Sequence, residues 1–468
     1  MPLEHSENQP AWVKDAVFYQ IFPDRFFAAG NTSNSPALTR WGSAPTRDNF
    51  FGGNLTGIRA KLDHIQNLGA NAIYLNPIFR AETSHRYDTT DYFTVDPLLG
   101  EKQDLLDLVG EIHRRGMRVI LDGVFNHCGD HFPPFVDVLK KGDASIYASW
   151  FTAMDYPLQP ETVNYLSCGG CEYLPKLNHS NAEVEEFLYS VAKFWLEEAG
   201  IDGWRLDVPY KIQPEFWQGF RQVVKAVNPR AYLVGEIWRE AQTWIKGDTF
   251  DGVTNYRLRE LILDYVKNQT LDAEDLGYEL VTLLRSHGTA AGCMLNLLGS
   301  HDTPRILNLL DGDMDWLRIA LALQMAVPGA PMVYYGDEVG LPGGADPDCR
   351  RCMPWEEKIW NQEIYEMTRQ LISIRARHPA LRYGMPEIML ALNGVLALKQ
   401  AHEADEVILV CNPREEVRDV PVAINSERID WVDALSGESY TARDGRLFFE
   451  NIPAKSVRVL VPAREQGN

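Results

Sequence analysis

Between about residue 15 and residue 336, short apolar runs alternate with polar loops and amphipathic stretches. In the segments 103–115 and 182–199 the apolar residues recur at helical spacing. Strands that alternate with helices are typical of stacked β/α units around a parallel sheet, and eight such strands favour a closed barrel. The predicted strands are 17–22, 72–75, 118–122, 203–207, 232–236, 252–255, 294–298 and 332–335.

Two segments depart from this alternation. Roughly fifty residues rich in Pro, Gly and aromatics separate the third strand from the next helix, a length that indicates a functional loop or a small inserted domain. After a helical stretch at 362–377, short alternating segments such as 395–399 predict an antiparallel β domain. We therefore predict four sections: 1–126 and 179–380 for the barrel, 127–178 for the inserted domain, and 381–468 for the C-terminal domain.

The composition narrows the possible partners. Forty-five Lys and Arg against 65 Asp and Glu give 468 residues a formal charge of -20, which argues against nucleic acid or an anionic membrane. A neutral substrate fits better, and the 12 Trp, 19 Tyr and 19 Phe suit sugar stacking as well as core packing. The first twenty residues lack the pattern of a signal peptide and no apolar run reaches the length of a membrane span, so we expect a cytoplasmic protein.

Seven cysteines include two CxxC pairs, Cys168 with Cys171 and Cys349 with Cys352. Free thiols are the default in a reducing compartment. Four thiols can hold zinc if the fold brings both pairs together, so metalloenzyme chemistry stays an alternative.

The stretch GWRLDVPYK places Arg205 and Asp207 two residues apart on an apolar strand, so both side chains point to the same side. A buried structural ion pair and a catalytic pair both explain this pattern. The active site of a parallel barrel lies at the carboxyl ends of its strands, and four predicted strands end in polar groups. These ends are DGVFNH (122–127), RLD (205–207), GEIW (235–238) and SHD (300–302).

Two carboxyl groups about 5 to 5.5 Å apart can cleave a glycosidic bond with retention, one as nucleophile and one as acid/base. Arg205 favours the ionised form of Asp207, which suits the nucleophile, and the apolar neighbours of Glu236 favour the protonated acid. Asp302 supplies a third carboxylate. His127 and His301 are donors suited to sugar hydroxyls, although a helix cap or a core role also explains a single histidine.

The four strand-end motifs resemble, in order and spacing, the signature regions of the α-amylase family, glycoside hydrolase family thirteen. LPKLN (174–178) resembles the extra signature of the neopullulanase, cyclomaltodextrinase and maltogenic amylase subgroup, as do YQIFPDRF (19–26), HRYDTTDY (85–92) and GGADPDCRRCMPW (343–355). The resemblance implies an α/β fold: a (β/α)8 TIM barrel with a small domain inserted after the third strand and a C-terminal antiparallel β-sandwich. It also implies a retaining mechanism.

Matching motif positions imply the individual roles. Asp207 resembles the family nucleophile, Glu236 the acid/base and Asp302 the residue that stabilises the transition state. The matched substrate-binding residues are Arg205, His127 and His301 around the cleaved sugar, Tyr87 as the aromatic platform beneath it, Asp346 and Arg350 on the non-reducing side, and Trp238 on the leaving-group side.

Three departures from the subgroup change what we expect. The barrel pattern begins almost at once, without the usual N-terminal β domain, which favours a monomer over the subgroup's dimer. The segments 28–36 and 52–54 carry Asn or Ser where calcium ligands are expected, so we predict no calcium and no other cofactor or metal. The residues 208–211 read VPYK instead of the more usual Val-Ala-Asn-Glu, which leaves the leaving-group specificity open.

The function expected from the resemblance is hydrolysis of α-1,4-glucosidic bonds in maltooligosaccharides, cyclodextrins or related cyclic glucans. Maltose is the expected main product, and action on pullulan stays open. A transglycosylase or isomerase that uses the same site is the nearest alternative, because both reactions share the covalent intermediate. A non-catalytic binding subunit with this fold is a more distant alternative.

Overall fold

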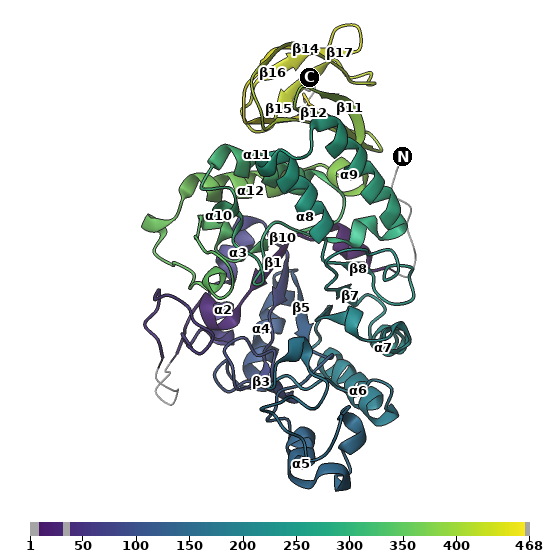
Figure 1. Ribbon diagram of the computed structural model, residues 1–468. Coiled ribbons are helices and arrows are strands. Elements are labelled where there is room, and N and C mark those ends of the chain that lie inside the picture. Colours follow the sequence, from purple (N-terminus) through teal and green to yellow (C-terminus); the bar gives the residue numbers. More distant parts are fainter. Residues whose placement is uncertain (1–8, 31–37, 464–468) are drawn as a thin grey trace.

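Eight parallel strands form the centre of the protein in the computed structural model, which describes residues 9–30 and 38–463 (Figure 1). Their order around the sheet is β8-β7-β6-β5-β2-β1-β10-β9. A parallel bridge between Thr254 and Leu295 joins the two outer strands, so the sheet closes into the predicted barrel. The strands are β1 (Phe18–Ile21), β2 (Ala72–Leu75), β5 (Arg118–Gly123), β6 (Gly203–Leu206), β7 (Tyr232–Gly235), β8 (Gly252–Val253), β9 (Leu295–Leu297) and β10 (Ala330–Tyr334).

These strands form because their sequences are apolar on both faces. Alternate residues, such as Phe18 and Tyr74, fill the barrel interior, while their neighbours Tyr19 and Ile73 pack against the surrounding helices. Helix α4 shows the matching pattern, with Leu105, Leu108, Val109 and Ile112 buried at helical spacing. The side chains of its N-terminal residues Glu101 and Asp104 form a capping box, which fixes where the helix begins.

The predicted helical stretches are confirmed as α4 (Lys102–Arg114), α6 (Ala182–Glu198) and α12 (Gln362–Arg377). The remaining helices are α1 (Pro23–Phe26), α2 (Leu55–Ala60), α3 (Leu62–Leu68), α5 (Pro133–Lys141), α7 (Pro214–Val227), α8 (Tyr256–Leu263), α9 (Ala273–His287), α10 (Ile306–Leu309), α11 (Met314–Ala326) and α13 (Ala380–Tyr383). Among the described residues, none of these helices is long and apolar enough to cross a membrane.

The segment between β5 and α6 extends away from the barrel, as the length of this segment predicts. This segment contains α5, short helical turns and isolated bridges such as Ser167 with Pro175 and His127 with Lys176. A hairpin of β3 (Phe79–Ala81) and β4 (Thr89–Val95) follows β2. Helix α5, the turns and the bridges fit an inserted domain over 127–178, whose boundaries stay a prediction. Helix α5 lies at the end of the molecule opposite the C-terminal strands (Figure 1).

The C-terminal strands form two antiparallel layers around their own core, which confirms the predicted sandwich. Trp431, Val422 and Leu447 are buried between the six-stranded and the two-stranded sheet. The six-stranded sheet contains β11 (Glu387–Leu392), β12 (Val395–His402), β13 (Asp405–Asn412), β18 (Ser456–Pro462), β15 (Asp430–Asp433) and β16 (Ser439–Thr441), and the other sheet contains β14 (Val417–Ala423) and β17 (Arg446–Ile452).

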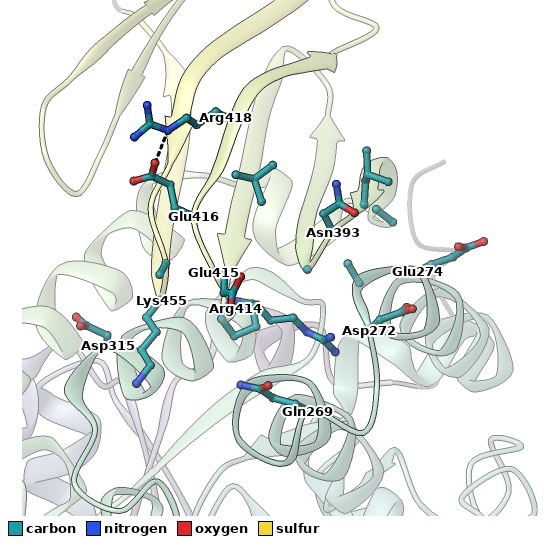
Figure 2. Close-up of a pocket in the computed structure, with 17 residues that line it drawn as sticks. Gln269, Asp272, Glu274, Asp315, Asn393, Arg414, Glu415, Glu416, Arg418 and Lys455 are labelled. Carbon is teal, nitrogen blue, oxygen red and sulfur yellow. Dashed lines mark hydrogen bonds and ion pairs between the residues drawn. The ribbon is translucent and has the colours of Figure 1, made fainter.

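A polar cleft of about 1300 Å³ lies where the sandwich meets the barrel helices. Figure 2 shows Arg414 extending toward the loop that carries Gln269 and Asp272, and Arg414 Nη2 donates a hydrogen bond to the carbonyl of Leu271 at 2.9 Å. None of the residues that line this cleft belongs to the four polar strand ends. It is therefore separate from the site described next.

Candidate active site

Arg205, the third residue of β6, sits at the centre of a cluster of carboxyl groups. Its Nη1 lies 2.8 Å from an oxygen of Asp122 and 2.8 Å from an oxygen of Asp207, and its Nη2 lies 3.1 Å from Glu236. These side chains come from the carboxyl ends of β5, β6 and β7, which are neighbours in the barrel. The predicted convergence of these strand ends is therefore confirmed, and one guanidinium holds both members of the predicted catalytic pair.

The carboxyl groups of this cluster outnumber its single guanidinium group. Burial raises the pKa of Asp207 well above its usual range; Arg205 opposes this shift and Glu236 adds to it. Burial also raises the pKa of Asp122, again against the effect of Arg205. The expectation that Arg205 alone keeps Asp207 ionised is thus incomplete, because three carboxyl groups share one guanidinium. As a unit the cluster retains a proton to higher pH than isolated carboxyl groups do.

Glu236 is held by donors on both of its oxygens. Trp238 Nε1 donates to Oε1 at 3.0 Å, and the backbone N–H of Val208 donates to Oε2 at 3.0 Å. Val208 adopts φ 44° and ψ 43°, a left-handed conformation that is strained for a β-branched residue. Trp238 stacks on Tyr256 with ring centroids 3.8 Å apart. Besides the apolar neighbours expected from sequence, the carboxyl group thus has fixed polar partners.

Asp302 faces the cluster from the end of β9. Arg350 Nη2 lies 3.2 Å from its Oδ1, and His301 Nε2 lies 3.1 Å from its Oδ2. The Tyr87 hydroxyl lies 2.5 Å from His301 Nε2 and donates to Asp122 at 2.8 Å, and the Tyr87 and His301 rings lie nearly parallel with centroids 5.6 Å apart. This chain of contacts joins Asp302 to the carboxyl cluster.

Both histidines of the site are held neutral. Burial lowers the pKa of His301 well below its usual range, and burial lowers the pKa of His127 to about 4. Asn126 Nδ2 lies 3.2 Å from His127 Nδ1 and donates to it. Because Nδ1 accepts this hydrogen bond, the proton of the neutral ring is on Nε2. This buried Nε2 makes no hydrogen bond of ordinary geometry with the described residues. It is a donor available to a substrate hydroxyl.

The outer predicted residues lie at the edges of this network. Arg350 Nη1 pairs with Asp346 at 3.0 Å, so Arg350 bridges Asp346 and Asp302. Trp238 is 38% exposed beside Glu236, and its indole borders the open side of the site. These contacts connect nine of the ten predicted residues, and His127 interacts with the backbone of Tyr87. The roles of all ten stay predictions.

Three supporting residues were missed from the sequence. Asp122 accepts hydrogen bonds from Arg205 and from two tyrosines, and it opens the DGVFNH motif that already marked its strand end. Gln20 lies 2.8 Å from His301 Nδ1, and a polar residue inside the apolar run FYQI was the available signal. Tyr256, which lies under Trp238, begins a helix and has no such signal.

In and beside the described part of the segments 28–36 and 52–54, the candidate oxygen ligands already have hydrogen-bond partners, and the absence of calcium stays a prediction. Asp24 already accepts from Arg25 and from the backbone N–H groups of Phe51 and Gly52. Asn54 caps α2 through its side-chain oxygen, 2.7 Å from the N–H of Gly57. Residues 31–36 of the stretch lie outside the described residues. Within 9–30 and 38–463, no three His, Cys, Asp or Glu gather as a metal site, which removes the support for zinc on the two CxxC pairs.

A closed parallel barrel with carboxyl groups gathered on one guanidinium at its carboxyl-end rim is compatible with a glycosidase. The family profile described as "Alpha amylase, catalytic domain" matches residues 20–382. The chain therefore belongs to the α-amylase family and is a glycoside hydrolase.

Its relatives agree with this assignment. It is 44% identical to a cyclomaltodextrinase of Geobacillus thermopakistaniensis over 92% of this chain and 74% of that protein. It is 42% identical to neopullulanase 2 of Thermoactinomyces vulgaris over 94% of this chain and 76% of that protein. The solved structure of the cyclic α-maltosyl-(1→6)-maltose hydrolase of Arthrobacter globiformis matches with a TM-score of 0.88 at 40% identity, covering 97% of this chain and 99% of that one.

Proposed function

We propose that this protein hydrolyses α-1,4-glucosidic bonds in maltooligosaccharides and cyclic glucans with retention of configuration, and releases mainly maltose. The observation that carries the proposal is the contact of Arg205 with both Asp207 and Glu236. Two carboxyl groups on one guanidinium fit the spacing of about 5 to 5.5 Å that a retaining pair needs.

In the proposed mechanism, a carboxylate oxygen of Asp207 attacks the anomeric carbon while Glu236 donates its proton to the leaving oxygen. The Val208 N–H and the Trp238 indole keep Glu236 in place. Water, activated by Glu236 as a base, then hydrolyses the glycosyl ester. Asp302, fixed by Arg350 and His301, faces the positive charge that develops on the sugar ring.

The substrate binding that we propose follows from the same contacts. The ring of Tyr87 lies edge to edge with His301 through its hydroxyl, so His301 does not cover its faces, and its partial exposure leaves room for a pyranose to stack on it. The His127 Nε2–H and Arg205 donate to hydroxyls of that sugar. Arg350 and Asp346 close the non-reducing side, and Trp238 lines the side of the leaving group.

The proposal that cyclic glucans are substrates is based on the names of similar proteins. One is named a cyclomaltodextrinase, and the hydrolase of cyclic α-maltosyl-(1→6)-maltose shares 40% of its residues with this chain across almost its entire length. The latter match favours a cyclic maltose-containing tetrasaccharide as a second candidate substrate. A monomeric state and a cytoplasmic location stay predictions, to be tested by analytical ultracentrifugation and by cell fractionation.

Glycosyl transfer to a sugar is the second candidate reaction. Tyr210 is 47% exposed and interacts electrostatically with Glu236, so an aromatic face is available beside the leaving-group side. A sugar stacked there competes with water for the glycosyl ester.

The test is timed product analysis of maltoheptaose, β-cyclodextrin, pullulan and starch with the wild type and with Glu236→Gln, which keeps the shape but loses the proton. We expect the wild type to open cyclodextrin and to yield maltose of retained configuration, and the variant to be inert on all four. Products longer than the substrate would show that transfer dominates. Inertness of the wild type on every glucan, or an unaffected variant, would overturn the proposal.

A further inference from the structure

The sequence CGGC at 168–171 forms a tight turn in the inserted segment. The Cys171 N–H donates to the Cys168 carbonyl at 3.1 Å, and the two intervening glycines have φ values of 62° and 76°. A turn of this kind brings its first and fourth Cα atoms within about 7 Å, and a disulfide needs roughly 4.4 to 6.8 Å. The backbone therefore already holds the two cysteines at bonding range.

The Cys171 sulfur lies close to the turn, and both thiols are partly exposed. A Cβ placed on Gly169 would lie 4.0 Å from Cys171 Sγ, so this sulfur folds back over the turn. Both cysteines are partly exposed, and Gly169 and Gly170 between them are exposed. The other five cysteines, Cys128, Cys293, Cys349, Cys352 and Cys411, are buried.

The turn lies at the edge of the active site. The Cys168 thiol interacts electrostatically with Asp207, Glu236 and Lys211. Lys176, on the returning strand of the same segment, donates to the carbonyl of Lys211 at 2.7 Å. The turn is thus fastened to the residues that follow Asp207 in the chain.

On its other side the turn approaches the sugar platform. Tyr173 interacts electrostatically with Cys171 and packs against His85 at 6.5 Å, and His85 packs against Tyr87 at 5.8 Å. The CGGC turn therefore lies near Glu236 through Cys168 and is linked to the platform residue Tyr87 through Tyr173 and His85.

We propose that Cys168 and Cys171 form a reversible disulfide across this turn by exchange with low-molecular-weight disulfides such as oxidised glutathione, and that the disulfide alters the leaving-group edge of the active site. The thiols are free in the structure, which is the reduced state. The second part of the proposal rests on the proposed function, whereas disulfide formation does not.

The exchange is balanced in atoms and electrons. One cysteine thiolate attacks a sulfur of oxidised glutathione and releases one glutathione thiolate, which takes up a proton. The second cysteine thiolate then attacks the mixed disulfide, forms the Cys168–Cys171 bond and releases the second glutathione. Two cysteines are oxidised and one glutathione disulfide is reduced. Burial raises the pKa of Cys168 to about 11, so the exchange is faster at alkaline pH.

The first experiment incubates the folded chain with oxidised glutathione, blocks the remaining thiols with N-ethylmaleimide under native conditions and maps the digested peptides by mass spectrometry. We expect the 168–171 peptide to lack two hydrogen atoms and to carry no maleimide. Cys168→Ser and Cys171→Ser serve as matched controls, and each should retain a glutathionyl group on its single remaining cysteine. A wild-type chain that carries two separate glutathionyl groups, or that keeps two thiols reactive to maleimide, overturns the proposal.

The second experiment compares kcat, KM and the ratio of transfer to hydrolysis on maltoheptaose for reduced, oxidised and re-reduced protein. We expect oxidation to change kcat/KM by roughly threefold or more and dithiothreitol to reverse the change. The double variant Cys168→Ser/Cys171→Ser should not respond to either reagent. A mapped disulfide without a kinetic change would overturn the proposed effect on the active site. If the reduced protein already hydrolyses no glucan, the proposed function fails, and the disulfide result is unaffected.

Discussion

Replacing Arg205 by lysine tests whether the planar guanidinium organises the site. Arg205 contacts three carboxyl groups through two nitrogens, at 2.8, 2.8 and 3.1 Å, and its side chain is 2% exposed. Lysine keeps the positive charge, but a single ammonium on a shorter side chain cannot hold all three carboxyl groups in this geometry. Arg205→Lys should therefore fold and yet lose the alignment of Asp207 with Glu236.

The magnitude follows from the contacts that are lost. A hydrogen bond to a charged group contributes about 1.5 to 3 kcal/mol. Loss of one such bond in the transition state lowers kcat/KM about 10- to 150-fold, since about 1.4 kcal/mol corresponds to a tenfold change in rate. Weaker stabilisation of the ionised nucleophile also raises the pKa of Asp207 further, so the acid limb of the pH profile moves to higher pH.

The assay is the pH dependence of kcat/KM on β-cyclodextrin and on a maltoside with a nitrophenol leaving group, which needs little help from an acid. Arg318→Lys, at a partly exposed arginine paired with Asp315 on α11, is the matched control and should keep the wild-type profile. Should Arg205→Lys stay within about twofold of the wild type with an unmoved acid limb, the guanidinium geometry does not matter and the reasoning is wrong.

Three further predictions follow. Trp238→Phe keeps the stack on Tyr256 but removes the donor to Glu236, so kcat should fall about tenfold, as stopped-assay kinetics would show. Burial lowers the pKa of His287 to about 4, below its usual 6.5, so the unfolded chain binds a proton first and stability falls as pH drops from about 6.5 to about 4. His287→Gln should reduce this loss in thermal unfolding at pH 7.5 and pH 5. Chelation with EDTA should leave Tm and kcat unchanged. A lower Tm after chelation would show that a bound calcium ion stabilises the fold.

The local pattern of the chain was sufficient for the barrel strands and for the two principal carboxyl groups. A charged pair two residues apart on an apolar strand, as Arg205 and Asp207 are, has few explanations, and parallel strand ends meet at one rim. Gln20 and Asp122 required knowledge of which strands are neighbours, because Gln20 acts on His301 from far away in the sequence. Gln20 and Asp122 belong to the site through tertiary contacts, and no local sequence pattern encodes such contacts.

Other features depended on packing that a linear pattern does not reveal. The strand predicted at 252–255 shortens to Gly252–Val253, because Asn255 caps helix α8, which begins at Tyr256. The hairpin of β3 and β4 was not predicted. The balance of charge around Asp207 also escaped the sequence, since the excess of carboxyl groups over cations emerges only when three strand ends converge on Arg205.

That excess of carboxyl groups has a consequence for inhibitors. Asp122, Asp207, Glu236 and Asp302 gather at this rim with only the two guanidinium groups of Arg205 and Arg350 as paired cations. A ring that carries a permanent positive charge, as a protonated imino sugar does, meets the field that the oxocarbenium-like transition state meets. Such a compound should compete far better than an uncharged sugar of the same shape, and a sugar acid should scarcely bind.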